Sequence, residues 1–189
     1  MDRRKFCLSS VAAAISGAAA GLAFGPSVRL YKFIYDRRYP AGRAFGAAAG
    51  HVVSNAGTVA IDGDITALWS RELRAEWSAG GGAIAGMTTA RTLFCLEQLA
   101  QDHWMRVVVR AEHATSGAHE IAHRVTASEP MLARMRSVLA ANNWPTMMPA
   151  GLATFQGADG SPRMTRMVAP GRDTRCAMTD EMLVSFVIA

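Results

Sequence analysis

The feature that most constrains the fold is a regular alternation of short apolar runs and longer helix-patterned segments over the first two-thirds of the chain. The strand-like runs are 30–36, 57–64, 80–87 and 106–113, and the helix-like segments between them are 41–53, 65–77 and 88–104. Repeated strand–helix–strand units of this length place their strands in parallel, with the helices packed against the sheet. We therefore expect four strands that run in the same direction.

The last third of the chain has a weaker pattern. Residues 119–127 alternate apolar and polar side chains, which predicts a hairpin with the strand before them. Residues 128–143 open with Ser, Glu and Pro in the order typical of a helix start, residues 144–181 are loop-rich, and 181–189 reads as a strong strand. The predicted fold class is α/β, a single domain over 29–189, with a partly parallel sheet, an added hairpin and an irregular C-terminal third.

Composition agrees with a globular domain and argues against one class of partner. Of the 189 residues, 50% are apolar and 19% are charged, which is ordinary globular composition with enough chain to bury a core. The formal net charge is +5, but no block of like charge is long enough to follow a phosphate backbone. Nucleic acid is therefore not an expected partner.

The N-terminal segment 1–28 carries Arg3, Arg4 and Phe6 in the pattern R-R-x-F, followed by a stretch rich in Ala and Gly. This segment resembles a twin-arginine (Tat) signal peptide, although Cys7 stands where Leu is commonest. The resemblance implies export of the folded chain to the periplasm by the Tat translocase. Passengers of this route often carry a cofactor, or travel with a partner that does, which raises the expectation of redox or metal chemistry.

Whether the signal segment is removed stays open. Residues 18–20 offer the small-residue arrangement A-x-A of a cleavage site. Residues 6–28, however, hold no charge and match the roughly 20 residues that cross a bilayer as a helix. The segment is therefore either a cleaved signal peptide or a retained N-terminal anchor.

Two cysteines lie beyond the signal segment, Cys95 and Cys176. An oxidising compartment allows one disulfide between them, and two buried free thiols are the alternative. Their spacing does not decide between these states.

The string H-E-x-x-H of zinc peptidases occurs at His119, Glu120 and His123. In a helix, histidines at i and i+4 reach one zinc ion, with the Glu as general base. On a strand, four residues span about 13 Å, so that both histidines cannot bind one ion. Because the local pattern alternates with period two, we expect a strand here, and a zinc peptidase is the less favoured alternative.

Polar side chains gather where the predicted parallel strands end. In open α/β sheets, ligands bind at the carboxyl ends of the strands. By the assignment above, these ends carry Asp36, Asp62, Asp64, Thr88, Thr89, Glu112 and His113. We therefore predict that the three aspartates converge on one edge of the sheet and can hold a metal ion.

The stretch from Thr58 to Thr66, TVAIDGDIT, resembles the first motif of the haloacid-dehalogenase-like phosphotransferases, a hydrophobic strand followed by D-x-D-x-T. The resemblance implies that Asp62 is a nucleophile, that Asp64 is a general acid/base and that Mg²⁺ is bound beside them. No Lys follows in the chain to supply the family's third motif. The alternative is that Asp62 makes the turn and Asp64 caps the helix that begins after it.

The sequence supports two hypotheses for the function. The leading hypothesis is a small periplasmic accessory or binding protein, associated with a larger exported or membrane protein such as a redox enzyme. The rival is a metal-dependent hydrolase or phosphatase that acts through Asp62 and Asp64. Clustering of Asp36, Asp62, Asp64 and Thr88 within reach of one metal ion would favour the enzyme. Scattered or capping carboxylates, with an exposed apolar patch elsewhere, would favour the binding protein.

Overall fold

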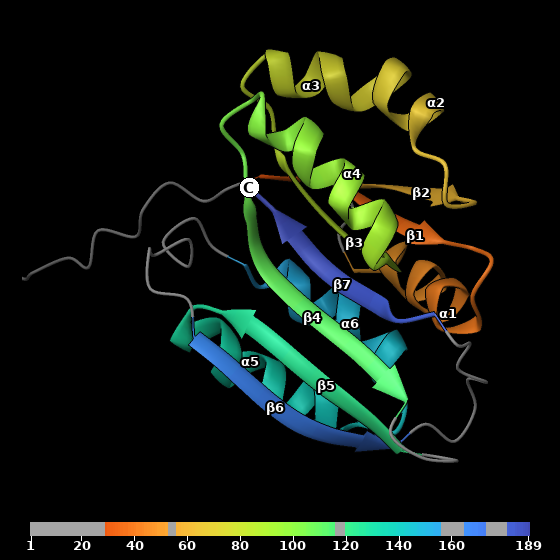
Figure 1. Cartoon of the computed structure of the whole chain (residues 1–189), viewed down its shortest axis with the longest axis vertical. Helices are drawn as coiled ribbons and strands as arrows, with labels where there is room; N and C mark the ends of the chain where they lie inside the picture. The colour runs from red at the N-terminus through yellow and green to blue at the C-terminus, as the bar shows by residue number, and fades with distance from the viewer. Residues whose placement is uncertain (1–28, 53–55, 116–119, 156–164, 173–180) are drawn as a thin grey trace, which may run out of the picture.

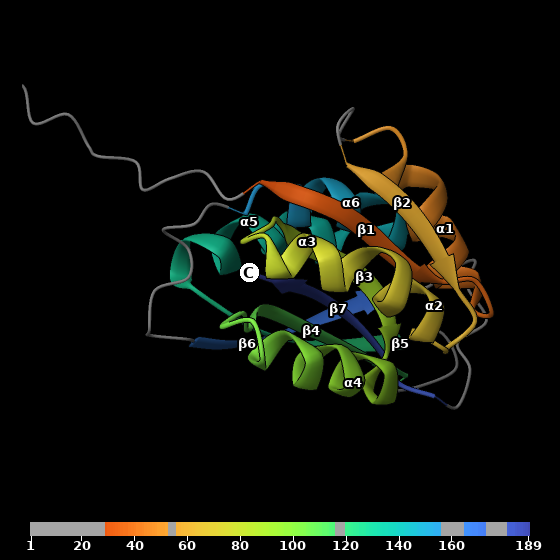
Figure 2. The same ribbon diagram turned by 90° about the horizontal axis from the view of Figure 1, so that it is seen from above.

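The computed structural model describes residues 29–52, 56–115, 120–155, 165–172 and 181–189. A single seven-stranded mixed sheet runs through these parts of the chain, with helices on both faces (Figures 1 and 2). The strands are β1 (Leu30–Asp36), β2 (Gly57–Ile61), β3 (Ala83–Thr89), β4 (Val107–Thr115), β5 (Glu120–Ala127), β6 (Thr165–Arg172) and β7 (Leu183–Ile188). Their order across the sheet is β2-β1-β3-β7-β4-β5-β6.

The helices divide between the two faces of the sheet. They are α1 (Pro40–Ala49), α2 (Thr66–Leu68), a π-helical turn (Trp69–Leu73), α3 (Arg74–Ser78), α4 (Ala90–Gln101), α5 (Glu129–Ala140) and α6 (Trp144–Ala153). α1, α5 and α6 bury one hydrophobic cluster against the sheet, and α2, α3 and α4 bury a second cluster on the other face. Among the described residues, none of these helices has the length and apolar character needed to span a membrane.

The predicted fold class is confirmed. β1 pairs in parallel with both β2 and β3, and β4 and β5 form the expected antiparallel hairpin. β7 lies antiparallel between β3 and β4, so that β4 runs in the same direction as β3 without touching it. Two elements lie in the loop-rich stretch 144–181, namely α6 and β6, and the sequence pattern identified neither.

Glycine at position 42 allows α1 to pack directly on the end of β1. A β-carbon built on Gly42 would overlap the backbone carbonyl oxygen of Asp36. Because a backbone atom cannot swing aside, we expect Gly42→Ala to lower the free energy of unfolding by about 1–3 kcal/mol, the usual cost of overpacking. Urea unfolding measures this loss.

The matched control is Gly50→Ala at the end of the same helix. A β-carbon on Gly50 meets nothing within 4 Å, and its backbone is right-handed helical. This variant should keep or slightly raise the stability. Equal losses for the two variants would contradict the steric explanation.

Candidate functional site

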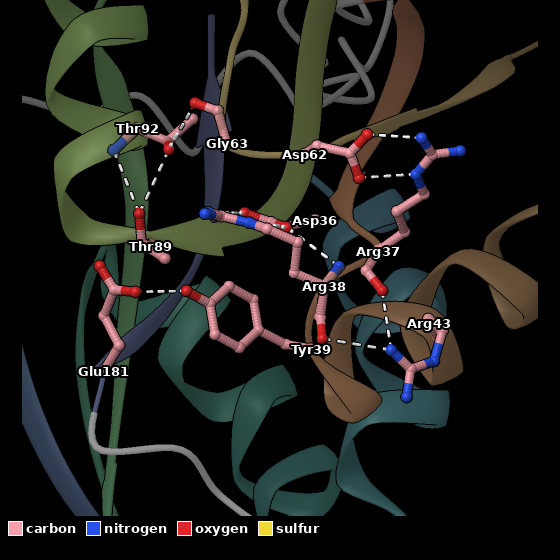
Figure 3. A network of polar contacts seen from close by, with 10 residues as sticks. All are labelled: Asp36, Arg37, Arg38, Tyr39, Arg43, Asp62, Gly63, Thr89, Thr92 and Glu181. Carbon is pink, nitrogen blue, oxygen red and sulfur yellow. Dashed lines mark hydrogen bonds and ion pairs between the residues drawn. The ribbon is translucent and has the colours of Figure 1, made fainter.

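The carboxyl ends of β1, β2 and β3 lie next to one another, as predicted from the sequence. Asp36 is in register with Ile61 at the end of β2, and Asp62 follows directly. Thr89 ends β3 and begins α4 as its N-cap. We call the region made by Asp36, Arg38, Asp62, Thr88 and Thr89 the strand-end edge, and Figure 3 shows these residues except Thr88.

Asp36 is used to fix an arginine. Its side chain is fully buried, whereas 44% of the Arg38 side chain is exposed. Arg38 donates to the two carboxylate oxygens of Asp36 from Nε at 2.9 Å and from Nη2 at 2.7 Å, and its backbone N–H donates to the same carboxylate at 3.2 Å. These hydrogen bonds raise the pKa of Arg38 above its ordinary value. The result is an arginine whose guanidinium is held by two-point hydrogen bonding and whose side chain stays partly exposed.

Asp62 and Asp64 are also engaged by neighbouring donors. Asp62 forms a two-point ion pair with Arg37, in which Nε lies 2.6 Å from Oδ1, and hydrogen bonding from Arg37 lowers the pKa of Asp62. Asp64 accepts the backbone N–H of Thr66 at 2.8 Å, and hydrogen bonding from Thr66 lowers the pKa of Asp64. Asp64 thus accepts a backbone N–H in the first turn of α2, although Ile65 is the N-cap residue of that helix.

In the described residues, Asp36, Asp62 and Asp64 are not arranged as one group that could hold a metal ion. Each carboxylate is committed to an arginine or to a helix start. Within the described parts of the chain, no group of three His, Cys, Asp or Glu side chains is arranged to hold a metal ion. Mg²⁺ is usually bound through one or two carboxylates with waters completing its shell, and at this edge the carboxylates are engaged by the donors named above.

The N-terminus of α4 completes the strand-end edge. The Thr89 hydroxyl accepts the backbone N–H of Thr92 at 3.3 Å, and the Thr92 hydroxyl donates to the carbonyl of Gly63 at 3.2 Å. Gly63 has a left-handed φ of 87°, and the Arg38 guanidinium packs where its side chain would stand. Arg38, the β2–α2 turn and the first turn of α4 are thus held together (Figure 3).

Thr88 contributes a buried hydroxyl to the same region. Side chains alternate along a strand, and Ile84 in β3 and Ile34 in β1 both belong to the cluster on the α4 side. Thr88 and Asp36 therefore face α4 from neighbouring strands, one step beyond the pair Tyr35 and Met87. Among the described atoms, the Thr88 hydroxyl has no hydrogen-bond partner, which marks it as a group that a ligand or water would satisfy.

Tyr39 extends the edge towards β7. Its hydroxyl donates to the carboxylate of Glu181, which precedes β7, and burial, together with this hydrogen bond, raises the pKa of Tyr39 to about 12. Sequence reasoning missed Arg38, Tyr39, Thr92 and Glu181. The available signal was the pair of arginines that directly follows the aspartate at the end of a strand.

The described part of the H-E-x-x-H string, from Glu120 to His123, is extended. Glu120 opens β5 and His123 lies within it, so this segment is extended, as the alternation predicted, and not helical. His119 lies outside the described residues.

His123 instead belongs to a buried polar chain. Its Nδ1 lies 2.8 Å from Nδ1 of His113 on the neighbouring strand, and Nε2 of His113 lies 2.9 Å from Oγ of Ser185. All three residues are fully buried, and Trp144 packs on both imidazole rings. Burial lowers the pKa of both histidines, that of His123 to about 4. The pair is therefore neutral at physiological pH.

A cavity of about 560 Å³ lies away from Arg38, between the end of α5 and the β5–β6 pair. Ile121, Ala169 and Gly171 contribute from the strands, and Ala140 and Asn142 from the helix end. A cavity of this size could hold a small ligand. We favour the strand-end edge because no basic side chain lines the cavity, whereas the edge presents an oriented cation and a helix N-terminus.

The remaining predicted residues are not brought together by the described structure. Cys95 is exposed on α4 as a free thiol, and Cys176 lies outside the described residues, so their pairing stays a prediction. Arg3, Arg4 and Phe6 of the export signal also lie outside the described residues.

Comparisons with known protein families, with curated proteins and with solved structures found no match for this chain. The fold and its site define a mixed α/β protein with an arginine-bearing edge at the carboxyl ends of its parallel strands. The function must therefore be argued from the geometry of that edge.

The two aspartate–arginine pairs should contribute unequally to stability. Asp36→Asn leaves the hydrogen-bonded position filled but weakens charge-assisted bonds that are shielded from water, and we expect a loss of about 1.5–3 kcal/mol in the free energy of unfolding. Asp62→Asn removes the charge from an ion pair in which both side chains are exposed. Because such pairs contribute little to the free energy of unfolding, we expect a smaller loss for this variant. Urea unfolding of both variants tests this, and equal losses would contradict the burial argument.

Proposed function

We propose that this chain is an exported accessory or binding protein of the periplasm, and that its strand-end edge binds an anionic group. The observation that carries the proposal is the guanidinium of Arg38, which buried Asp36 fixes while leaving 44% of the side chain exposed. An arginine oriented in this way loses little entropy on binding and matches phosphate or carboxylate oxygens.

Two further groups favour an anion at this position. α4 begins beside Arg38 with no acidic residue in its first turn, and a helix N-terminus attracts negative charge through its free N–H groups and its dipole. The hydroxyl of Thr88 offers a buried donor without a partner among the described residues. An oxyanion is the ligand class that satisfies a guanidinium, backbone N–H groups and a hydroxyl together.

The same geometry disfavours the metal-dependent hydrolase. A phosphotransferase of the D-x-D-x-T kind needs Asp62 free for attack and both aspartates close to Mg²⁺. Arg37 occupies both oxygens of Asp62, and Asp64 is engaged at the start of α2. Export by the Tat route and residence in the periplasm rest on the N-terminal motif alone, and belong to this proposal on that basis.

Titration calorimetry of the purified full chain tests the proposal, with phosphate, pyrophosphate and small dicarboxylates as probes and chloride as the reference anion. Arg38→Gln should weaken binding of the preferred anion by at least about tenfold, the equivalent of one lost charge-assisted contact. Thr88→Val should weaken it by a smaller factor.

Arg37→Gln is the matched control, because it makes the same charge change in the neighbouring, exposed ion pair. It should leave the affinity within about twofold, since screened surface charges contribute little. Equal losses of affinity in Arg37→Gln and Arg38→Gln would show that the anion is attracted by surface charge in general, which would contradict a specific site at Arg38. Release of phosphate from an ester that depends on Mg²⁺ and on Asp62, or stoichiometric metal in the protein purified from its native compartment, would replace it by the hydrolase.

A further inference from the structure

Trp104 occupies a position in the helix end of α4 that favours glycine. The backbone N–H of Trp104 donates to Gln101 and that of Met105 to Ala100, the two hydrogen bonds of a Schellman cap. Trp104 is the residue of this cap with a left-handed backbone, with a φ of 61°. A side chain at such a φ is strained by its own backbone, and glycine or asparagine is the usual choice.

Among the described residues, little packs against the Trp104 side chain to offset this strain. The Trp104 side chain is 98% exposed, whereas Trp77 and Trp144 are buried and Trp69 packs in an aromatic cluster with Trp77. A large apolar side chain at a strained and fully solvated position contradicts both local propensity and burial. Violations of this kind are expected where a residue serves a function outside the fold.

The position of Trp104 in the fold indicates what it contacts. At the start of β1, Leu30 is in register with Ala83 in β3. Ile84, the next residue of β3, pairs with Ile188 in β7. Ile188 also pairs with Val107 at the start of β4. Three strand spacings, about 14 Å, therefore separate the start of β1 from the start of β4. Trp104 precedes β4 by a short turn, so that it shares one end of the sheet with the point where residues 1–28 join the domain. The C-terminus lies at the same end (Figure 1).

The sequence that joins there has the chemistry of a membrane anchor. Residues 6–28 are uncharged, and Arg29 follows directly, with 67% of its side chain exposed although it pairs with Glu76. Arg106 is exposed two residues after Trp104. Tryptophan favours the interface between hydrocarbon and water, and arginines beside it favour anionic lipid headgroups.

We propose that Trp104 inserts into the headgroup region of the bilayer in which residues 6–28 are anchored, and so docks this end of the domain on the membrane. The inference rests on retention of the N-terminal segment, one of the two alternatives that the sequence left open. It is independent of the anion site, because the strand-end edge lies at the opposite ends of β1 and β3. Docked in this way, the domain presents Arg38 away from the lipid.

Tryptophan fluorescence of the full chain in nanodiscs of phosphatidylethanolamine and phosphatidylglycerol tests the proposal. Brominated acyl chains should quench part of the emission of the wild-type chain, and Trp104→Gly should lose that part. The same substitution should raise the Tm by about 2–4 °C, because glycine suits the cap and relieves the strain. A residue that is needed for the fold would lower the Tm when replaced.

The matched control carries the same number of tryptophans at another place. Phe94 is 59% exposed on α4, ten residues and about 15 Å from Trp104 along the helix direction. The double variant Trp104→Gly with Phe94→Trp should remain unquenched by brominated lipid. Equal lipid quenching of wild type and Trp104→Gly, or full access of an aqueous quencher to Trp104 in nanodiscs, would overturn the proposal and leave a protein partner as the contact of this indole.

Discussion

Replacing Trp144 by Ala should lower the free energy of unfolding by about 3–5 kcal/mol, as expected for the loss of a large buried aromatic side chain. Trp144 is fully buried at the start of α6 and belongs to the larger hydrophobic cluster. Its ring centroid lies 4.2 Å from that of His113 and 4.9 Å from that of His123. Truncation would therefore open a cavity and expose two neutral imidazoles to water. Urea unfolding at neutral pH measures the loss.

Two other substitutions in α6 make the result specific. Trp144→Phe keeps an aromatic ring against the histidines and should cost clearly less than Trp144→Ala. Met147 is 43% exposed on the same helix, and Met147→Ala should change the stability by no more than about 0.5 kcal/mol. If all three variants lost similar amounts, α6 would be failing as a helix, and the packing of Trp144 would not explain the effect.

The first two-thirds of the fold could be predicted because the local patterns are strong there. The position of β7 could not, since a C-terminal strand that inserts between β3 and β4 is chosen by long-range pairing and leaves no local mark. α6 escaped detection because it carries Pro149 inside the helix and has little contrast between its faces. β6 is an edge strand with Pro170, which weakens its strand pattern.

Part of the candidate site could be predicted from the sequence, and part of it could not. The topology of parallel strands correctly gathered Asp36 and Asp62 on one edge, because strand direction alone fixes where strands end. Their chemical state depends on whether Arg37 and Arg38 turn back onto them, which is a matter of side-chain geometry in one tight turn. The histidine pair depends on the hairpin register that sets His113 opposite His123, and a shift of one residue would have separated the two rings.

Acidification should destabilise the protein between about pH 6.5 and pH 4, before most carboxylates titrate. Burial lowers the pKa of His123 from 6.5 to about 4, and burial together with His123 lowers that of His113 well below 6.5. Below pH 6.5, His113 and His123 bind protons in the unfolded chain but stay neutral in the folded chain. The stabilising contribution of the two neutral histidines is therefore fully present above pH 6.5, and it is lost as the pH falls towards their folded pKa.

The size of this loss follows from the shift of one histidine. A difference of about 2.5 pH units corresponds to roughly 3 kcal/mol for His123, and His113 adds to it in the same direction. Asp62 and Asp64 have pKa values lowered from 3.8, so their contributions are lost only at more acidic pH. The upper part of this pH window, above the ordinary range of carboxyl groups, therefore reports chiefly on the imidazole pair.

Urea unfolding at pH 7.5 and at pH 4.5 measures the effect. His123→Leu should reduce the difference in stability between the two pH values, whatever it costs at neutral pH, because one titrating group is gone. His51→Gln, at an exposed position, should leave the difference unchanged. Imidazole NMR signals of the folded protein should show two rings that stay neutral at pH 5.5, and protonation of both rings near pH 6.5 without unfolding would contradict their burial in one hydrogen-bonded chain with Ser185.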